Sequence, residues 1–452
     1  MRASAALLAL FAALPCAAQP PARNPQVDAI LSAIRAPSIE ARIRKLASFH
    51  TRHTLSRTDS DREGIGAARR WIKSELDACS RAAGGRLKVE LDSFIQPPAR
   101  RVPKPVEIVN VVATLPGTQA PGRIYVVSGH YDSISSNVMD AESAAPGAND
   151  DASGVAAAME MACVMALHRF DATLVFMAVA GEEQGLLGSA HWAEEARKKG
   201  LNVAGMITND IIGSPKGPDG QRYDGTVRLF ANGLPALVES RSPVLGDIAR
   251  SGGENDTPAH QLGRFLKDAG ERYVPGMVVQ LIPRPDRFLR GGDHLPFLER
   301  GYAAVRFTEP VEDYRHQHQN VRIVNGVQQG DLPDFVDFDY VAKVTQVNAA
   351  GLASLALGPA TPRDAAIETV QLENDTTLRW SANDEPDLAG YRIVWRELGW
   401  PTWQHSREAG NVTRFTLPGI SKDNFVFGII AVDRDGNASP ASFPRPWRPA
   451  AQ

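Results

Sequence analysis

The stretch TLVFMAVAGEEQGLLGSAHWAEEARKKG, residues 173–200, decides the fold class of this chain. Its first part, TLVFMAVA, is a nearly continuous apolar run, which is typical of a strand buried on both faces of a sheet. The part that follows Glu182 and Glu183 has the pattern of a helix. A buried strand that leads directly into a helix is the unit from which parallel sheets covered by helices are built.

The same unit recurs on both sides of this stretch. Further apolar strands are expected at 124–128, 204–210 and 302–309, and a helix is expected at 151–168. Residues 25–80 have helical spacing, and the segments LKVELDSFIQ and VEIVNVVATLPG have the pattern of strands. We therefore predict an α/β fold with three layers, α/β/α, around a mostly parallel mixed sheet.

Residues 214–290 interrupt this pattern. They are rich in Gly, Pro and charged residues and show little periodicity. Such a segment is too long to be a simple connection in a compact domain. We expect it to supply lid or pocket-wall elements.

Five acid- and histidine-bearing stretches lie along the α/β region. Three of them follow the expected strands directly: His130 with Asp132, Glu182 with Glu183, and Asp210. Because open α/β sheets bind ligands beyond the carboxyl ends of their strands, we expect these side chains to converge on one edge of the sheet. The other two stretches are PGANDDASG, with Asp150 and Asp151, and YRHQHQ, with His316 and His318.

Together these stretches supply the oxygen and nitrogen ligands that Zn²⁺ accepts, with one carboxylate left over. That surplus carboxylate favours a catalytic site over a structural one. Each stretch alone also has a simpler interpretation. Asp before a helix is a good N-cap, and Glu182-Glu183 could be a solvated acid pair at a helix start. The isolated histidines are expected to be surface or satisfied core groups: His53, His168, His191, His260 and His405.

Length, composition and charge describe an ordinary globular protein. The chain of 452 residues is long enough for two domains, and its 43% hydrophobic and 22% charged residues are typical of folded proteins. A net charge of −3 gives no electrostatic reason to expect nucleic acid or an anionic membrane as a partner.

The N-terminus predicts export. Residues 1–18 have the charged start, apolar stretch and small-residue end of a signal peptide, with Gln19 as the mature start. The apolar run is too short to span a bilayer. A lipoprotein attached at Cys16 is the rival interpretation, which Pro15 disfavours. We expect a periplasmic or extracellular protein without a membrane span.

Two cysteines, Cys79 and Cys163, remain after removal of the signal peptide. An oxidising compartment would permit a disulfide between them. We expect them instead to be unpaired, because Cys163 falls on the apolar face of a helix and Cys79 near a helix end. Two cysteines are too few for a thiolate zinc cluster.

The pattern changes again near residues 359–362. The segments TTLRWSA, GYRIVWRE, TRFTLPG and NFVFGIIAVDRDGNAS are short strands with turns between them, and Trp380, Tyr391 and Trp395 supply a core. We predict a small all-β sandwich at 363–447 that resembles a fibronectin type III module, following an α/β domain at 19–358. This module could contact a substrate or a surface polymer, or act as a spacer.

The segments HYDS, PGANDDASG and AGEEQGLLGS, in this order and spacing, resemble the secreted di-zinc aminopeptidases of the bacterial leucyl aminopeptidase type. Glutamate carboxypeptidase-like enzymes are more distant relatives. The similarity covers residues 35–355 and includes TRHTLS and REGIGAARRWI. It implies a zinc-peptidase fold and a metallo-aminopeptidase that hydrolyses the N-terminal bond of peptides or proteins with two bridged Zn²⁺ ions.

The resemblance also implies a role for each residue. Asp150 would bridge the two ions, His130 and Asp210 would complete one zinc site, and Glu183 and His318 the other. Glu182 would be the general base, and Asp132 would be the partner of His130. The family usually has His-Thr followed shortly by Asp where this chain has YRHQHQNVR, so His316 is the alternative to His318.

The resemblance implies three further features. Asn149 stands where the family often has Asp, and the peptide bond between Asp150 and Asp151 is expected to be cis. The pair Asp293-His294 resembles a pocket pair of the family that does not bind metal.

Three alternatives to an aminopeptidase remain open. A carboxypeptidase would need arginines to bind a carboxylate, and Arg284, Arg287 and Arg290 keep that reaction open. A glutaminyl cyclase on the same scaffold would use fewer metal ions. A non-catalytic binding ectodomain is disfavoured, because all the expected ligands and Glu182 are present.

Overall fold

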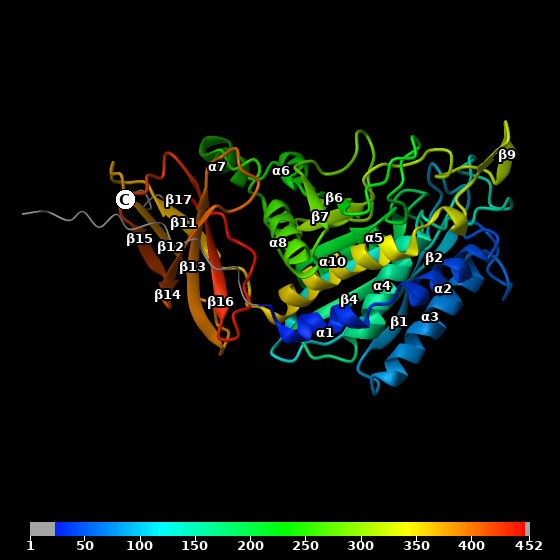
Figure 1. Cartoon of the computed structure of the whole chain (residues 1–452), viewed down its shortest axis with the longest axis horizontal. Coiled ribbons are helices and arrows are strands. Elements are labelled where there is room, and N and C mark those ends of the chain that lie inside the picture. The colour runs from blue at the N-terminus through cyan, green and yellow to red at the C-terminus, as the bar shows by residue number, and fades with distance from the viewer. Residues whose placement is uncertain (1–22, 448–452) are drawn as a thin grey trace, which may run out of the picture.

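The structure, a computed structural model, describes residues 23–447 of the chain. The signal peptide predicted at residues 1–18 lies outside this part. Figure 1 shows an α/β part followed by a smaller part made of strands. No helix in the described part is both long and apolar enough to cross a membrane.

An eight-stranded mixed sheet forms the centre of the α/β part, in the order β1-β2-β4-β3-β5-β8-β6-β7. Its strands are β1 (Lys88–Gln96), β2 (Val106–Leu115), β3 (Ala120–His130), β4 (Ala172–Val179), β5 (Asn202–Asn209), β6 (Thr226–Phe230), β7 (Val278–Ile282) and β8 (Ala304–Thr308). The neighbours β4, β3, β5 and β8 run parallel, whereas β1 and β2 are antiparallel at one edge. These parallel strands are the ones that the apolar runs predicted, so the mostly parallel mixed sheet is confirmed.

Helices cover both faces of this sheet, because side chains along each central strand alternate between two apolar clusters. On β3, Tyr125 and Val127 pack into the larger cluster and Val126 into the smaller one. The larger cluster lies under α1 (Pro25–Ala33), α2 (Ala36–Ala47), α3 (Gly64–Ala82), α4 (Ala152–Met165), α8 (Pro258–Tyr273) and α10 (Phe338–Leu357). The smaller one lies under α5 (Leu187–Lys198) and α9 (Leu295–Glu299). This confirms the three-layer α/β/α fold.

Residues 214–290 contain more regular structure than their composition predicts. Besides β6, β7 and α8 they include α6 (Leu234–Glu239) and α7 (Val244–Ser251). The strands were missed because β6 and β7 are five residues long and partly exposed, so no long apolar run marks them. We expected lid or pocket-wall elements in this segment and did not predict that it also contributes two strands to the central sheet.

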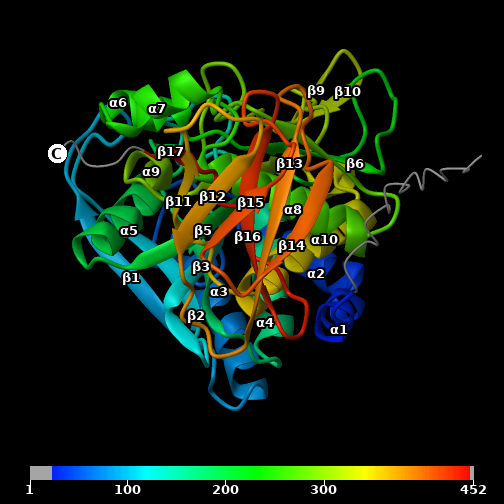
Figure 2. The same ribbon diagram turned by 90° about the vertical axis from the view of Figure 1, so that its left-hand side faces the viewer.

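The all-β part is a sandwich of two small sheets. Their orders are β15-β12-β11-β17 and β14-β13-β16. The strands are β11 (Arg363–Glu368), β12 (Thr376–Ser381), β13 (Leu388–Arg396), β14 (His405–Gly410), β15 (Arg414–Leu417), β16 (Val426–Asp433) and β17 (Arg445–Trp447). Trp380 of one sheet packs with Tyr391 and Phe427 of the other in one apolar cluster. Figure 2 shows the strands of the sandwich in front of the α/β part. The predicted all-β sandwich is therefore confirmed.

Buried ion pairs join the sandwich to the α/β part. Asp256 lies before α8 and accepts hydrogen bonds from Arg264 of α8 at 2.9 Å and from Arg396 of β13 at 2.6 Å. All three side chains are almost completely buried. A buried carboxylate that lost either partner would be costly, so the two parts are held in a defined arrangement.

Cys79 of α3 and Cys163 of α4 form a disulfide, with their Cα atoms 5.0 Å apart. The expectation that they are unpaired was wrong. The two helices pack against one another beneath the sheet, which brings together cysteines that are 84 residues apart in sequence. Helix periodicity places each cysteine on its own helix but does not show which helices are neighbours.

Candidate metal centre

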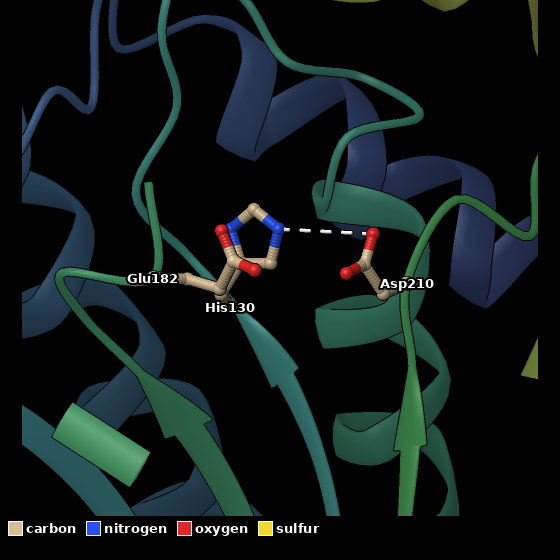
Figure 3. A group of neighbouring side chains, drawn as sticks. All are labelled: His130, Glu182 and Asp210. Carbon is tan, nitrogen blue, oxygen red and sulfur yellow. Dashed lines mark ion pairs between the residues drawn. The ribbon is translucent and has the colours of Figure 1, made fainter. Parts of the chain in front are cut away.

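The ends of neighbouring parallel strands bring three of the predicted residues together. His130 is the last residue of β3, and it is in register with Val179, the last residue of β4. Glu182 follows β4 and Asp210 follows β5. Figure 3 shows the side chains of His130, Glu182 and Asp210 close together above these strand ends, and one ligand atom of each lies within 4.8 Å of the others. The expected convergence on one edge is confirmed for these residues.

A second group of potential ligands consists of Asp150, Glu183 and His318. They come from the segment before α4, the turn after β4 and the segment after β8. The Nε2 atom of His318 lies 2.9 Å from Oδ2 of Asp150 and 2.9 Å from Oε1 of Glu183. Each group therefore contains one imidazole and two carboxylates.

The carboxylate of Asp150 lies between the histidines of the two groups. Its Oδ1 is 3.1 Å from Nε2 of His130, and its Oδ2 is 2.9 Å from Nε2 of His318. This is the arrangement expected of a ligand shared by two cations. Oε1 of Glu183 is buried, and its only close polar neighbour among the described residues is Nε2 of His318, at 2.9 Å. Imidazole nitrogens and carboxylate oxygens are ligands that suit Zn²⁺, so the residues present fit such a site.

Asp331 holds the main chain around Asp150 in place. Its carboxylate accepts the N–H groups of Asn149 at 2.8 Å and of Asp150 at 2.7 Å. The side chain of Asn149 in turn donates to buried Glu309 at 2.8 Å. Asp331 lies 181 residues from Asp150 in sequence and was not predicted as part of the site.

Asp151 has the capping role and lies in neither ligand group. It is the N-cap of α4 and accepts the N–H of Gly154 at 2.9 Å, while its other oxygen accepts the N–H of His130 at 2.9 Å. The peptide bond between Asp150 and Asp151 is cis, as the resemblance implied. The simple N-cap interpretation is thus right for Asp151, and the neighbouring carboxylate faces the histidines.

Asp132 is completely buried and fixes the turn that follows β4. It accepts the N–H groups of Glu182 and Glu183, each at 3.2 Å. Its carboxylate lies 3.7 Å from Nδ1 of His130, but the main-chain oxygen of Asp132 is the closer partner of that nitrogen, at 3.1 Å. Asp132 therefore positions both glutamates as well as the histidine.

The acids of the site are crowded in a buried space. Burial raises the pKa of Glu182 well above its usual range, and the charges of Glu183 and Asp210 add to this effect. Burial also acts to raise the pKa of Asp150, but His318 and His130 hold that pKa well below its usual range. Such a group of like charges is stabilised by cations, which is a further sign that the site fits metal ions.

Asp210 has a positively charged partner next to the ligand group. Arg306 of β8 lies 2.9 Å from its Oδ1 and also pairs with Asp286 at 2.9 Å. The guanidinium is fully buried. A buried carboxylate at a strand end requires such a partner, but Arg306 was not predicted from the sequence.

The two histidines of YRHQHQ contact different groups of residues. His318 belongs to the second ligand group, whereas the ring of His316 stacks on Phe335, with 3.7 Å between ring centroids. Between them, Gln317 donates to Oδ2 of Asp150 at 3.1 Å. The geometry favours His318 over His316 as a metal ligand.

A cavity of about 580 Å³ opens onto both groups. Besides the ligand groups, its wall includes Arg101, Leu186, Arg287, Arg290 and Tyr314. A larger cavity of about 940 Å³ lies elsewhere, next to His316 and Phe335, and no residue of the two ligand groups lines it. The smaller cavity is therefore the candidate substrate site. Residues of the segments 287–291 and 314–319 line it, whereas residues 214–282 do not.

Arg52 is a second residue that the sequence analysis did not single out. It is completely buried and donates to the main-chain oxygens of Tyr131 at 2.7 Å and Gly147 at 2.9 Å. It thereby joins the segments that carry His130 and Asp150. The signal for it was the segment TRHTLS, which resembles the family but contains no metal ligand.

The three-layer fold and the paired donor groups define a metal-dependent hydrolase. The chain belongs to peptidase family M28, whose model matches residues 110–323. A probable zinc metalloprotease of Leptosphaeria maculans is 47% identical over 426 residues, which cover 94% of this chain and 98% of that protein. A probable zinc metalloprotease of Pyricularia oryzae is 48% identical over 432 residues, covering 94% of this chain and 86% of that protein.

These alignments include most of the all-β part, because they span 94% of the chain. Among solved structures, the LapA aminopeptidase of Legionella pneumophila matches with a TM-score of 0.51 and 19% identity, over 73% of this chain and 75% of that one. At this identity the likeness concerns the fold.

Proposed function

We propose that this chain is an exported zinc-dependent aminopeptidase that uses two zinc ions. The observation that carries the proposal is the carboxylate of Asp150, which presents one oxygen to His130 and the other to His318. The names of the fungal relatives supply the identity of the metal, since both are called zinc metalloproteases.

We assign the ligands to two sites. Asp150 is shared, His130 and Asp210 belong to one zinc ion, and Glu183 and His318 belong to the other. Glu182 lies within the first group but is not needed as a ligand, so it is the candidate general base. Asp132 positions His130 and both glutamates.

Zinc ions held here would act as Lewis acids and lower the pKa of water towards neutrality. Glu182 would act as the general base, taking a proton from the attacking water and delivering it to the leaving amine. Asp132 accepts the N–H of Glu182 and thereby limits where the general base can move.

Two observations support the rest of the proposal. The disulfide between Cys79 and Cys163 favours an oxidising compartment, in agreement with export to the periplasm or the medium. The two sheets of the C-terminal part, packed around Trp380 and Tyr391, support a fibronectin type III-like module, which would contact a substrate or a surface polymer or act as a spacer.

A carboxypeptidase is the second candidate. Arg287 and Arg290 line the cavity and could bind the free carboxylate of a peptide. The two reactions differ in which end of the peptide must be free.

The test is a comparison of peptides whose ends are free or blocked, with a chelator as control. An aminopeptidase cleaves amino-acid anilides and peptides with a free amine, and it loses this activity when zinc is removed. Cleavage of N-blocked peptides with a free carboxylate would instead support the carboxypeptidase. No cleavage of either set would contradict both candidates.

A further inference from the structure

The charged side chains of the candidate substrate cavity fall into two sets. Among the described residues that line it, every acid belongs to one of the two ligand groups. The remaining charged side chains are three arginines: Arg101, Arg287 and Arg290. If the acids bind metal ions and a catalytic proton, the charged side chains that remain free to contact a substrate are all positive.

The arginines are not neutralised by the acids behind them. Arg228, Arg287 and Arg290 all pair with one carboxylate, that of Glu312, at 2.7–3.0 Å. Next to them, Arg306 pairs with Asp286 and with the candidate ligand Asp210. Asp286 also pairs with Arg287. Four guanidinium groups thus share three carboxylates, one of which is a candidate metal ligand, so this side of the cavity carries an excess of positive charge.

The same pairs fix the arginines before any substrate arrives. The side chain of Arg287 is 10% exposed and that of Arg290 is 31% exposed, and both rest on buried Glu312. A guanidinium that is already ordered loses little entropy when it binds an anion, and its free N–H groups match both oxygens of a carboxylate.

Arg101 adds a third guanidinium from a different segment, the connection between β1 and β2. Its Nη1 donates to the main-chain oxygen of Glu183 at 2.6 Å, which ties it directly to the ligand segment. In the described residues, no acidic side chain lies within salt-bridge distance of Arg101. Its charge is therefore available to a ligand in the cavity.

We propose that Arg287 and Arg290, assisted by Arg101, bind a carboxylate of the substrate, so that the preferred substrates are peptides with a carboxylate close to the scissile bond. This rests on the proposed peptidase activity and specifies its substrate class. The carboxylate has two possible sources: the side chain of an acidic first residue, or the free C-terminus of a dipeptide. In either case a substrate whose first residue is basic is disfavoured, because no spare acid lines the cavity.

Two pairs of matched peptides distinguish the sources. Leucyl-alanine and leucyl-alaninamide differ only in the terminal carboxylate, and glutamyl- and glutaminyl-p-nitroanilide differ only in the side chain. Binding is measured by calorimetry on the zinc-loaded Glu182→Gln protein, and turnover is measured on the unaltered protein. We expect the charged member of at least one pair to bind about tenfold or more tightly, and its kcat/KM to rise mainly through KM.

Variants connect the preference to the arginines. Arg290→Gln should reduce the ratio between charged and neutral substrates by about tenfold, and Arg290→Lys should retain part of it. The matched control is Arg284→Gln: this arginine stacks on the exposed ring of Phe288, at 4.0 Å, and does not line the cavity. The control should leave the ratio unchanged, and thermal unfolding of each variant verifies that it is folded.

The two proposals fail in different ways. Equal binding of both members of both pairs would overturn the carboxylate site, even if all four compounds were hydrolysed. Absence of hydrolysis would contradict the peptidase proposal, while the calorimetric ratio would still decide whether a carboxylate is recognised. Cleavage of leucyl-alanine only, with an unchanged ratio in Arg290→Gln, would place the recognition elsewhere and reject the assignment.

Discussion

Asp331 accepts the main-chain N–H group of Asp150 at 2.7 Å, and this contact fixes the residue whose carboxylate lies between two histidines. Asp331 contacts neither histidine. Residues that position metal ligands commonly change metal affinity about 10- to 100-fold when they are replaced. The structure therefore predicts an effect of Asp331 on zinc affinity that does not depend on direct ligation.

Asp331→Asn should weaken zinc binding by about 10- to 100-fold, because one carboxylate oxygen is replaced by an NH₂ group that faces an N–H donor. Competition with a chromogenic chelator measures the change. The matched control is Asp334→Asn, since Asp334 is an exposed aspartate near Asp331 in sequence. Equal zinc affinities in the two variants would show that the contact with Asp150 is unimportant.

His318→Ala should lower the zinc content of the purified protein, because it removes the only imidazole of its group. His316→Ala should retain the metal, since the ring of His316 stacks on Phe335 away from the ligands. Elemental analysis after dialysis compares the two variants. Loss of zinc in His316→Ala with retention in His318→Ala would reverse the assignment.

Reduction of the disulfide should destabilise the folded protein. The bond between Cys79 and Cys163 closes a loop across 84 residues, and such cross-links commonly contribute about 2–4 kcal/mol to the free energy of unfolding. Thermal unfolding with and without a phosphine reductant, which spares zinc better than dithiols, measures the loss. A Cys79→Ala, Cys163→Ala double variant should not respond to the reductant, and an equal response would assign the effect to another cause.

Acid should destabilise the protein partly through His260. Burial, followed by the charges of Arg264 and Arg396, lowers the pKa of this histidine from 6.5 to about 3. His260 therefore binds a proton near pH 6.5 in the unfolded chain but only near pH 3 in the folded chain. The contribution of His260 to the free energy of unfolding is therefore complete above pH 6.5. It decreases as the pH falls from 6.5 towards about 3, by up to about 1.4 kcal/mol per pH unit.

Urea unfolding at pH 7 and pH 5 measures this dependence. His260→Gln should lose less stability between the two values than the unaltered protein does. An identical loss in both proteins would indicate that other groups cause the acid sensitivity.

The sequence predicts the parts of the fold that depend on apolar runs, and it misses those that depend on pairing in space. Strands β3, β4, β5 and β8 were found because they are buried on both faces, whereas the short, partly exposed β6 and β7 were not. The disulfide was missed because helical spacing does not reveal that α3 and α4 are neighbours.

The candidate site likewise contains some residues that the sequence predicts and others that it misses. Residues at strand ends, such as His130 and Asp210, were placed together by a general rule for α/β sheets, and the resemblance supplied their roles. Asp331 and Arg306 could not be predicted, because each is an ordinary charged residue in sequence and acquires its role only by contact with Asp150 or Asp210.

We propose that Glu182 carries a proton beside a pair of zinc ions and is not one of their ligands. The most direct measurement is zinc content and peptidase activity of Glu182→Gln beside the unaltered protein. We predict about two zinc ions per chain in both proteins, with turnover reduced at least about 10²-fold in the variant. Loss of zinc from Glu182→Gln, or turnover close to that of the unaltered protein, would contradict the account.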